Sequence, residues 1–232
     1  SLKGWRVSSE LRFKKLRAMK LRERVLLLII VPLLIYILIG SCANTSTPPM
    51  GGPKDTIPPK LLKLLPDSGM VNFPIKDGRI VLTFDEYVVL AEEQKNIYLS
   101  PPQEKLPKTR IKGKSIVVRF EEPLDSNTTY LLHFGNSIKD NNEGNLFYPY
   151  AYPFSTSSTI DTMMISGVVM DSQTLLPAKG ATIALYLNHS DSAVLTERPS
   201  AIAKSDDWGY FVVRNLKNQP YALYAFEDMN FN

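Results

Sequence analysis

The feature of this chain that most restricts its fold is a series of about seven short apolar runs between Lys60 and Ser157, separated by turn residues. No long helical period runs through this segment. The composition agrees, because 17 prolines, 10 phenylalanines and 11 tyrosines favour strands and turns over helices. The pattern predicts an all-β fold, with the strands packed as a sandwich.

Two of these runs alternate strictly between apolar and polar residues. In Arg79–Phe84 and Ser115–Phe120, the second, fourth and sixth residues are expected to face the core. Lys112-Gly113-Lys114 precedes the second run and predicts a hairpin turn in which Gly113 takes a positive φ. Further strands are expected at 61–65, 96–100, 108–111, 129–134 and 150–155, with Pro101, Pro102, Pro107 and Pro123 between them.

A set of short motifs links the segment 60–158 to a known family. The motifs are Ile57-Pro58-Pro59, Pro66-Asp67-Ser68-Gly69, Phe84-Asp85-Glu86-Tyr87-Val88, Asn127-Thr128-Thr129-Tyr130, Asp140 with Gly144-Asn145, and Phe154-Ser155-Thr156. Together they resemble the bacterial Ig-like domain of the SbsA type. The resemblance implies a rigid spacer or binding unit of cell-envelope proteins, and this family has no shared catalytic site.

The segment 162–232 has a different character. It contains Ile165–Asp171, Pro177–Tyr186 and Asp206–Leu216, and it resembles the carboxypeptidase regulatory-like module, a small prealbumin-type sandwich without catalytic activity. Asp207-Trp208-Gly209-Tyr210-Phe211 predicts a turn that leads into an alternating strand, and Tyr221–Phe226 predicts the next strand. The sequence ends at Asn232, and we expect this module to be truncated there.

The N-terminal part contains an uncharged run, 25–39, with a strongly basic segment before it. As a helix this run would span about 22 Å, which is short of the ~30 Å hydrocarbon core of a bilayer, and Pro32 interrupts it. A basic head, an apolar run of this length and small residues at its end are typical of a secretory signal.

The run ends in Ile39-Gly40-Ser41-Cys42, and Cys42 is the single cysteine of the chain. This sequence resembles the lipobox of bacterial lipoproteins. The resemblance implies cleavage after Ser41 and lipidation of Cys42, with Ile39, Gly40 and Ser41 as the cleavage motif. An uncleaved anchor and a buried structural cysteine remain as alternatives. A multi-chain lipid anchor would hold the protein permanently on a membrane.

The predicted organisation follows from this cysteine. Residues 1–41 are the signal peptide with an upstream extension, and Met19 is the expected start of translation. Residues 42–59 are the lipidated cysteine and a tether rich in Pro and Gly. Surface-exported lipoproteins of the Bacteroidota carry acidic residues directly behind the cysteine, whereas the first acid here is Asp55. We therefore expect an outer-membrane lipid anchor on the periplasmic face.

The positive net charge of +4 comes from the N-terminal segment alone. Nine cations and two acids lie in residues 1–24, so the rest of the chain has 18 cations and 21 acids. A basic nucleic-acid footprint is therefore absent from the body of the chain. One cysteine also excludes an intramolecular disulfide and a CxxC metal knuckle.

The sequence offers no recognisable catalytic set. HExxH, GxSxG, a P-loop and GxGxxG are absent, and no cofactor or metal is expected. His133 is expected on a strand surface, and His189 in a polar turn. In the doublets Asp85-Glu86 and Glu121-Glu122, neighbouring side chains point to opposite faces of a strand, so neither doublet forms an acid and base pair. We expect these carboxylates to be solvated or to cap turns.

Two segments have candidate binding chemistry. The loop 136–145 is rich in oxygen ligands, but its glycine and its twelfth position do not follow the EF-hand rule, which favours an ordinary Asx/Gly loop over a Ca²⁺ site. The segment 147–154 holds five aromatic residues. Tyr148, Tyr150 and Tyr152 are a candidate exposed ledge for a glycan or a partner, and the alternative is an edge strand, broken by proline, whose aromatics lie in the core.

These observations predict a non-enzymatic envelope lipoprotein whose tandem sandwiches hold or bind an envelope or outer-membrane protein. Two other functions stay open. In the first, the sandwiches are targeting modules of a larger envelope enzyme whose catalytic domain lies beyond residue 232. In the second, they bind a glycan on the tyrosine ledge.

Overall fold

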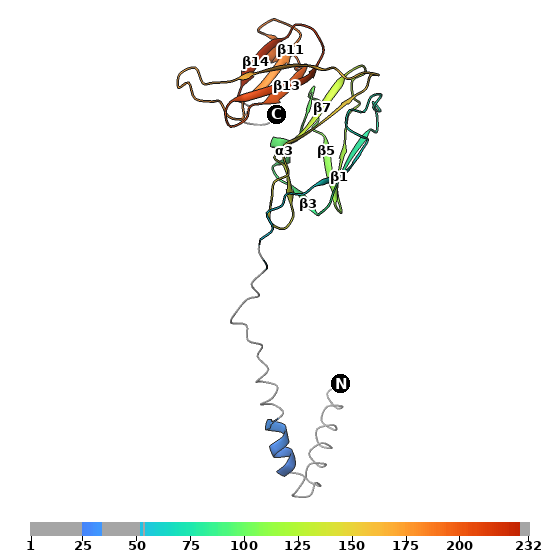
Figure 1. Ribbon diagram of the computed structural model, residues 1–232, viewed down its shortest axis with the longest axis vertical. Coiled ribbons are helices and arrows are strands. Elements are labelled where there is room, and N and C mark those ends of the chain that lie inside the picture. The colour runs from blue at the N-terminus through green and yellow to red at the C-terminus, as the bar shows by residue number, and fades with distance from the viewer. Residues whose placement is uncertain (1–24, 34–51, 53, 228–232) are drawn as a thin grey trace, which may run out of the picture. The chain divides into compact units, whose positions relative to one another are not determined.

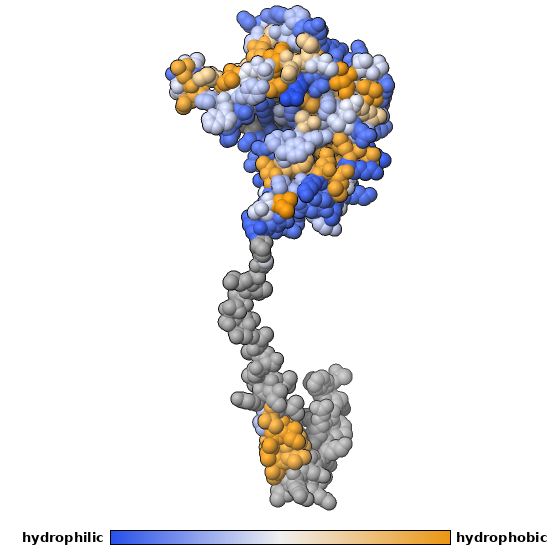
Figure 2. Space-filling model, in the orientation of Figure 1, coloured by the Kyte–Doolittle hydropathy of each residue, from blue (hydrophilic) through white to orange (hydrophobic). Residues whose placement is uncertain are grey.

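A computed structural model describes residues 25–33, 52 and 54–227 of the protein (Figure 1). The chain divides into two compact units, Ser1–Pro53 and Lys54–Asn232. Residues 25–33, within the predicted apolar run, form a helix whose visible face is hydrophobic (Figure 2). Across the described ranges, no helix has both the length and the apolar character needed to cross a membrane.

The first sandwich of the second unit is built almost entirely from strands. Its elements are β1 (Leu61–Leu65), β2 (Arg79–Phe84), β3 (Val88–Leu90), α3 (Glu93–Asn96), β4 (Tyr98–Ser100), β5 (Lys108–Lys112), β6 (Ser115–Arg119), β7 (Thr129–Gly135), β8 (Ile138–Asp140) and β9 (Tyr150–Ser155). They form an antiparallel sheet β1-β2-β6-β5, a second one β4-β7-β9, and a pair β3-β8.

The core of this sandwich lies between the two larger sheets, and it is filled by the side chains that face inward at every second position of the strands. Ile80, Leu82 and Phe84 are inward on β2 and have at most 1% exposure. Ile116 and Val118 on β6 are fully buried, while Phe120, just past the strand, packs partly buried against the same core. The facing sheet contributes Tyr130, Leu132, Phe134, Tyr152 and Phe154. The inward residues predicted for these two runs are confirmed.

The predicted strands all occur, with small differences at their ends. The hairpin between β5 and β6 turns at Gly113, whose φ is +60°, as expected. The short strands β3 and β8 and the one-turn helix α3 were not expected. Pro101, Pro102, Pro107 and Pro123 lie outside strands, and Pro153 lies in β9, an edge strand of its sheet.

The second module is also a small sandwich. It consists of β10 (Met163–Val168), β11 (Thr182–Tyr186), α4 (Ala193–Thr196), β12 (Ala201–Lys204), β13 (Tyr210–Leu216) and β14 (Ala222–Phe226). The pair β10-β13 packs against the sheet β12-β11-β14. Their shared core contains Ile183, Leu185, Ala201, Ala203, Phe211, Val213 and Leu216. Tandem β-sandwiches therefore follow residue 60, as the sequence predicts.

Candidate functional site at the junction of the two sandwiches

The two sandwiches meet on the outer face of sheet β4-β7-β9. On β7, Tyr130, Leu132 and Phe134 face the core of the first sandwich, so Leu131 and His133 face outward. Leu131 is nevertheless only 4% exposed. Strand β13 lies beside β7 (Figure 1), and β12 lies beside β4. These contacts explain the burial of Leu131. The second module thus covers the outer face of the first.

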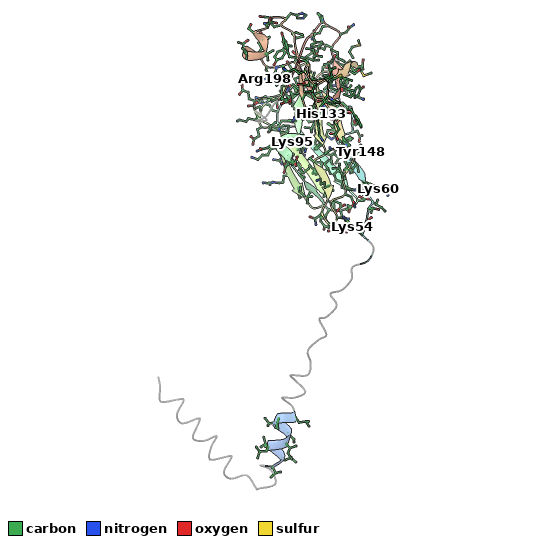
Figure 3. The ribbon with its side chains drawn as sticks, turned by 90° about the vertical axis from the view of Figure 1, so that its left-hand side faces the viewer. Lys54, Lys60, Lys95, His133, Tyr148 and Arg198 are labelled. Atoms are coloured by element: carbon green, nitrogen blue, oxygen red, sulfur yellow. The ribbon has the colours of Figure 1, made fainter. Side chains whose placement is uncertain are left out.

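His133 lies within this junction and not on a free strand surface, so that expectation is wrong. Its ring stacks on Tyr98 with the ring centroids 4.4 Å apart and the planes 13° from parallel. The pKa of His133 is lowered to about 4, mainly because the ring is buried and also because of the positive charge of Arg214 on β13. His133 is therefore neutral at pH 7, and its position is labelled in Figure 3.

Polar contacts fix the junction at several points. The Ile202 N–H donates to Ser100 Oγ at 2.9 Å, and Lys204 Nζ donates to the Lys95 carbonyl at 2.7 Å. Lys204 Nζ also lies 5.5 Å from the centre of the Tyr98 ring. At the other end of the junction, Lys217 Nζ donates to the Asn127 carbonyl at 2.9 Å. Side chains from both modules hold the junction together.

The connection between the sandwiches is hydrogen-bonded as well. Asp161, between β9 and β10, accepts a bond from Thr129 Oγ1 at 2.8 Å, and its N–H donates to the same hydroxyl. Its carbonyl accepts a bond from Asn215 Nδ2 of the second module at 3.0 Å. The connecting segment is therefore tied to both sandwiches.

Comparison with known proteins identifies the first sandwich. Residues 55–156 match the family of bacterial Ig-like domains. No curated protein sequence matches the chain. This match confirms the resemblance to a bacterial Ig-like domain for this part of the sequence. We call residues 55–156 the Ig-like domain from here on.

Several solved structures are similar to the chain at low scores. They are the S-layer protein rSbsC, residues 31–844 (TM-score 0.30, 16% identity, 67% of this chain and 19% of that one), an L,D-transpeptidase from Mycobacterium smegmatis (0.28, 11%, 71% and 79%), and BcpA*(D312A), the major pilin subunit of Bacillus cereus (0.22, 12%, 72% and 58%). The chain thus spans about a fifth of the length of that S-layer protein. Similarities this weak carry no information on function.

The tyrosine ledge does not exist as predicted. Tyr148 is 59% exposed, but Tyr150 is half-buried and Tyr152 is completely buried in the core of the Ig-like domain. The hydroxyl of Tyr152 lies within hydrogen-bond distance of the Pro66 carbonyl at 3.2 Å and of the Asp67 carbonyl at 3.1 Å. Tyr150 and Tyr152 share one face of β9, and that face points inward. The segment therefore matches the alternative given in the sequence analysis, an edge strand whose aromatic side chains lie in the core.

The loop 136–145 closes on its own carboxylate. Asp140 Oδ1 accepts the N–H groups of Asn142, Glu143 and Gly144 at 2.6 to 3.0 Å, and Oδ2 accepts that of Asn145 at 2.8 Å. Desolvation acts to raise the pKa of Asp140, but these four backbone bonds outweigh it and lower the pKa. The carboxylate oxygens already have partners, so the loop is an Asx/Gly loop.

One acid of each carboxylate doublet has a partner elsewhere in the chain, which differs from the expectation of solvated or turn-capping carboxylates. Glu121 pairs with Lys108 Nζ at 3.0 Å, and the Asp85 carboxylate accepts the N–H of Lys60 at 2.8 Å. Within the part of the chain that the structure describes, no group of three or more His, Cys, Asp or Glu side chains is arranged to hold a metal ion.

A small cleft opens at one end of the junction. It has a volume of about 280 Å³, and Arg198, Arg214 and Lys217 border it together with Asp125 and Asp161. Figure 3 labels Arg198 in the second module and His133 in the Ig-like domain. Both acids already interact with hydroxyls, Asp125 with Tyr130 and Asp161 with Thr129. The cleft therefore combines three cations with two acids that have protein partners.

Cys42 and the residues Ile39, Gly40 and Ser41 lie outside the described residues, so lipidation stays a prediction. The junction was missed from the sequence. A signal for it exists in Leu131 and His133, because an apolar residue and an aromatic one at outward strand positions indicate that a second layer covers the sheet.

Proposed function

We propose that this protein is a non-enzymatic structural module of the bacterial cell envelope that holds or binds an envelope protein assembly. The observation that carries the proposal is the packed junction, in which Leu131 is buried and His133 stacks on Tyr98. A flexible pair of domains would leave this face of the Ig-like domain in water. Two sandwiches joined in this way form a stiff spacer, which suits a protein that positions a partner.

The proposal includes a lipid anchor at Cys42. Its support is the sequence Ile39-Gly40-Ser41-Cys42 behind a charge-free run, together with the Pro/Gly-rich stretch up to residue 59. On this proposal the anchor lies in the outer membrane of a member of the Bacteroidota, and the sandwiches face the periplasm. The second module is then of the carboxypeptidase regulatory type, which is consistent with its two packed sheets.

Intact mass spectrometry of the protein extracted from its own envelope tests the anchor. We expect a chain that starts at Cys42 and carries fatty acid, and we expect Cys42→Ser to abolish both cleavage and acylation. A native chain with an unmodified sulfur and with residues 1–41 still attached would contradict this part of the proposal.

Crosslinking in cells tests the proposed role. A photocrosslinker at an exposed position of the Ig-like domain, such as Tyr87 at 61% exposure, is expected to capture a discrete envelope protein. The matched control places it at the buried Tyr130, which faces the core of the domain. If no envelope protein is recovered from any of a set of exposed positions, the role in holding an assembly is wrong.

A further inference from the structure

A second and larger cleft lies at the opposite end of the junction. Its volume is about 700 Å³, within the range of roughly 300 to 1,000 Å³ that is usual for small-ligand sites. The Ig-like domain lines it with α3 and the start of β8, including Asn96, Asn136 and Lys139, and the second module lines it with Lys179 and Trp208. Neither sandwich forms this cleft alone.

Trp208 is the most unusual residue of the cleft. Its side chain is 77% exposed, and among residues 54–227 it has neither a ring contact nor a hydrogen bond to its indole N–H. The backbone beneath it is fixed, because the N–H groups of Trp208 and Tyr210 both donate to Asp206 Oδ1, at 2.8 and 2.9 Å. A large aromatic ring is thus presented to solvent on a rigid turn, so a ligand that stacks on it pays little ordering entropy.

The charges around Trp208 favour an anion. Four lysines border the cleft, of which Lys95 pairs with Glu92 at 3.5 Å and Lys179 with Asp207 at 2.8 Å. The third acid, Asp206, accepts the two backbone N–H groups named above. In the described part of the chain, the ammonium group of Lys139 has no acidic partner. The cleft that the exposed indole lines therefore keeps a net positive charge.

The remaining groups distinguish between kinds of ligand. The centre of a protein interface is normally depleted in lysine and surrounded by apolar contacts that exclude water. This cleft is lined instead by ammonium, amide and carboxylate groups, with Trp208 as its one large aromatic ring. Amide side chains such as Asn96 and Asn136 match the donors and acceptors of sugar hydroxyls. The apolar face of a sugar ring fits flat against an indole.

We propose that this cleft binds an acidic saccharide, with one sugar ring stacked on Trp208 and a carboxylate of the ligand beside Lys139. The site differs from the predicted tyrosine ledge in position and in residues. It also does not depend on the proposed anchor or on the holding of an assembly, so either proposal can fail without the other.

Tryptophan fluorescence measures binding at this cleft directly. The chain has two tryptophans, Trp5 and Trp208, so Trp5→Phe makes Trp208 the sole reporter. The full chain is kept in a detergent without sugar groups and is titrated with oligogalacturonate, alginate and hyaluronan fragments. We expect at least one of them to change the emission of Trp208 in a saturable way. We expect a neutral galacto-oligosaccharide of the same length to bind about tenfold more weakly.

Variants then assign the contacts by calorimetry. Trp208→Ala is expected to weaken the acidic saccharide about tenfold, and Lys139→Gln about threefold. Tyr148→Ala and Lys63→Gln are the matched controls, since each changes an exposed side chain that does not line the cleft, and neither should change the affinity. Circular dichroism checks that each variant is folded.

Three results would overturn the proposal. In the first, none of the acidic saccharides changes the Trp208 emission at millimolar concentration. In the second, Trp208→Ala binds as well as the parent chain, or Tyr148→Ala loses binding instead. In the third, the neutral saccharide binds equally well, which would remove the role of the charge.

Discussion

The rings of Tyr98 and His133 stack almost in parallel, 4.4 Å apart, on the face where the Ig-like domain meets the second module. The two residues are cross-strand partners on β4 and β7. Lys204, from the second module, lies over the Tyr98 ring. A proton on His133 would place a second positive charge near Arg214 and in a poorly solvated position, and stability is therefore expected to depend on the state of this imidazole.

Acid is expected to weaken the folded unit through His133. Its folded pKa is about 4, below the ordinary value of 6.5, so only the unfolded chain takes up this proton between these two pH values. Stability is unaffected above pH 6.5 and falls as the pH drops toward 4, by on the order of 2 kcal/mol after allowance for partial exposure. Urea unfolding at a series of pH values measures this loss.

His133→Gln is the control for this effect. It removes the titrating group and keeps a polar side chain, so the difference between parent and variant is expected to shrink as the pH falls from 7 to 4. A difference that does not change with pH would show that His133 titrates normally.

A charge at Leu131 is expected to separate the two sandwiches. Leu131→Asp places a carboxylate on the buried outer face of β7 and should lower the free energy of unfolding by about 3 kcal/mol. Calorimetry is expected to resolve two transitions in place of one. Leu62→Asp, at a leucine with 66% exposure, is the matched control and should stay within about 0.5 kcal/mol of the parent. A single unshifted transition in Leu131→Asp would mean that the junction is not packed.

The tyrosines of β9 are expected to differ strongly in their effect on stability. Tyr152→Ala empties a fully buried site and should cost about 3 to 5 kcal/mol, and Tyr152→Phe, which removes only the hydroxyl bonded near Pro66, about 1 kcal/mol. Tyr148→Ala should cost about 0.5 kcal/mol, because this side chain is 59% exposed. Equal losses in urea unfolding for Tyr148→Ala and Tyr152→Ala would contradict the placement of β9.

Local patterns predicted the strands well, because alternation over five or six residues is enough to identify a half-buried strand. Arg79–Phe84 and the Gly113 hairpin are examples. The pair β3-β8 joins two three-residue strands that lie about 50 positions apart, and so few residues do not show a period. Alternation placed Tyr148, Tyr150 and Tyr152 on one face but does not say which face is inside. That depends on which sheet packs behind β9.

The candidate sites depend on long-range contacts even more. His133 looked like a surface residue because its own strand does not identify which segment covers it, and β12 and β13 follow about 70 and 80 positions later. The Asp140 loop was interpreted correctly, since an Asx/Gly turn is stabilised within ten residues. The cleft beside Trp208 needs both sandwiches to be in place. The proposed lipid-anchor motif, by contrast, is a short linear pattern, so its prediction does not depend on long-range contacts.

Removal of the Asp140 carboxylate charge is expected to loosen the loop 136–145. Asp140→Asn replaces one acceptor oxygen by an amide that donates, so part of the set of four backbone N–H groups loses its acceptor. We expect a lower midpoint in urea and faster amide exchange at Asn142 to Asn145. Asp67→Asn, an exposed acid outside the loop, is the control and should leave both unchanged. Unaltered exchange in Asp140→Asn would show that the carboxylate does not hold this turn.

Alanine substitution of two glycines tests how closely the turn that presents Trp208 is packed. Gly209 lies in that turn, and Gly113, in the hairpin between β5 and β6, is the comparison. Both Gly113 and Gly209 have a positive φ, +60° and +73°. A methyl group at Gly113 would meet nothing within 4 Å, so Gly113→Ala should cost only the strain of the left-handed backbone, about 1 kcal/mol.

At Gly209 the same methyl group would overlap the carbonyl oxygen of Val169, and the backbone must move to accept it. Gly209→Ala is therefore expected to cost about 3 kcal/mol in urea unfolding and, in the Trp5→Phe background, to shift the Trp208 emission. Gly113→Ala should leave that emission unchanged. Because Gly209 O also accepts the N–H of Val169 at 2.8 Å, movement here disturbs the end of β10 as well as the indole. Equal costs for the two substitutions would mean that the turn under Trp208 is not closely packed.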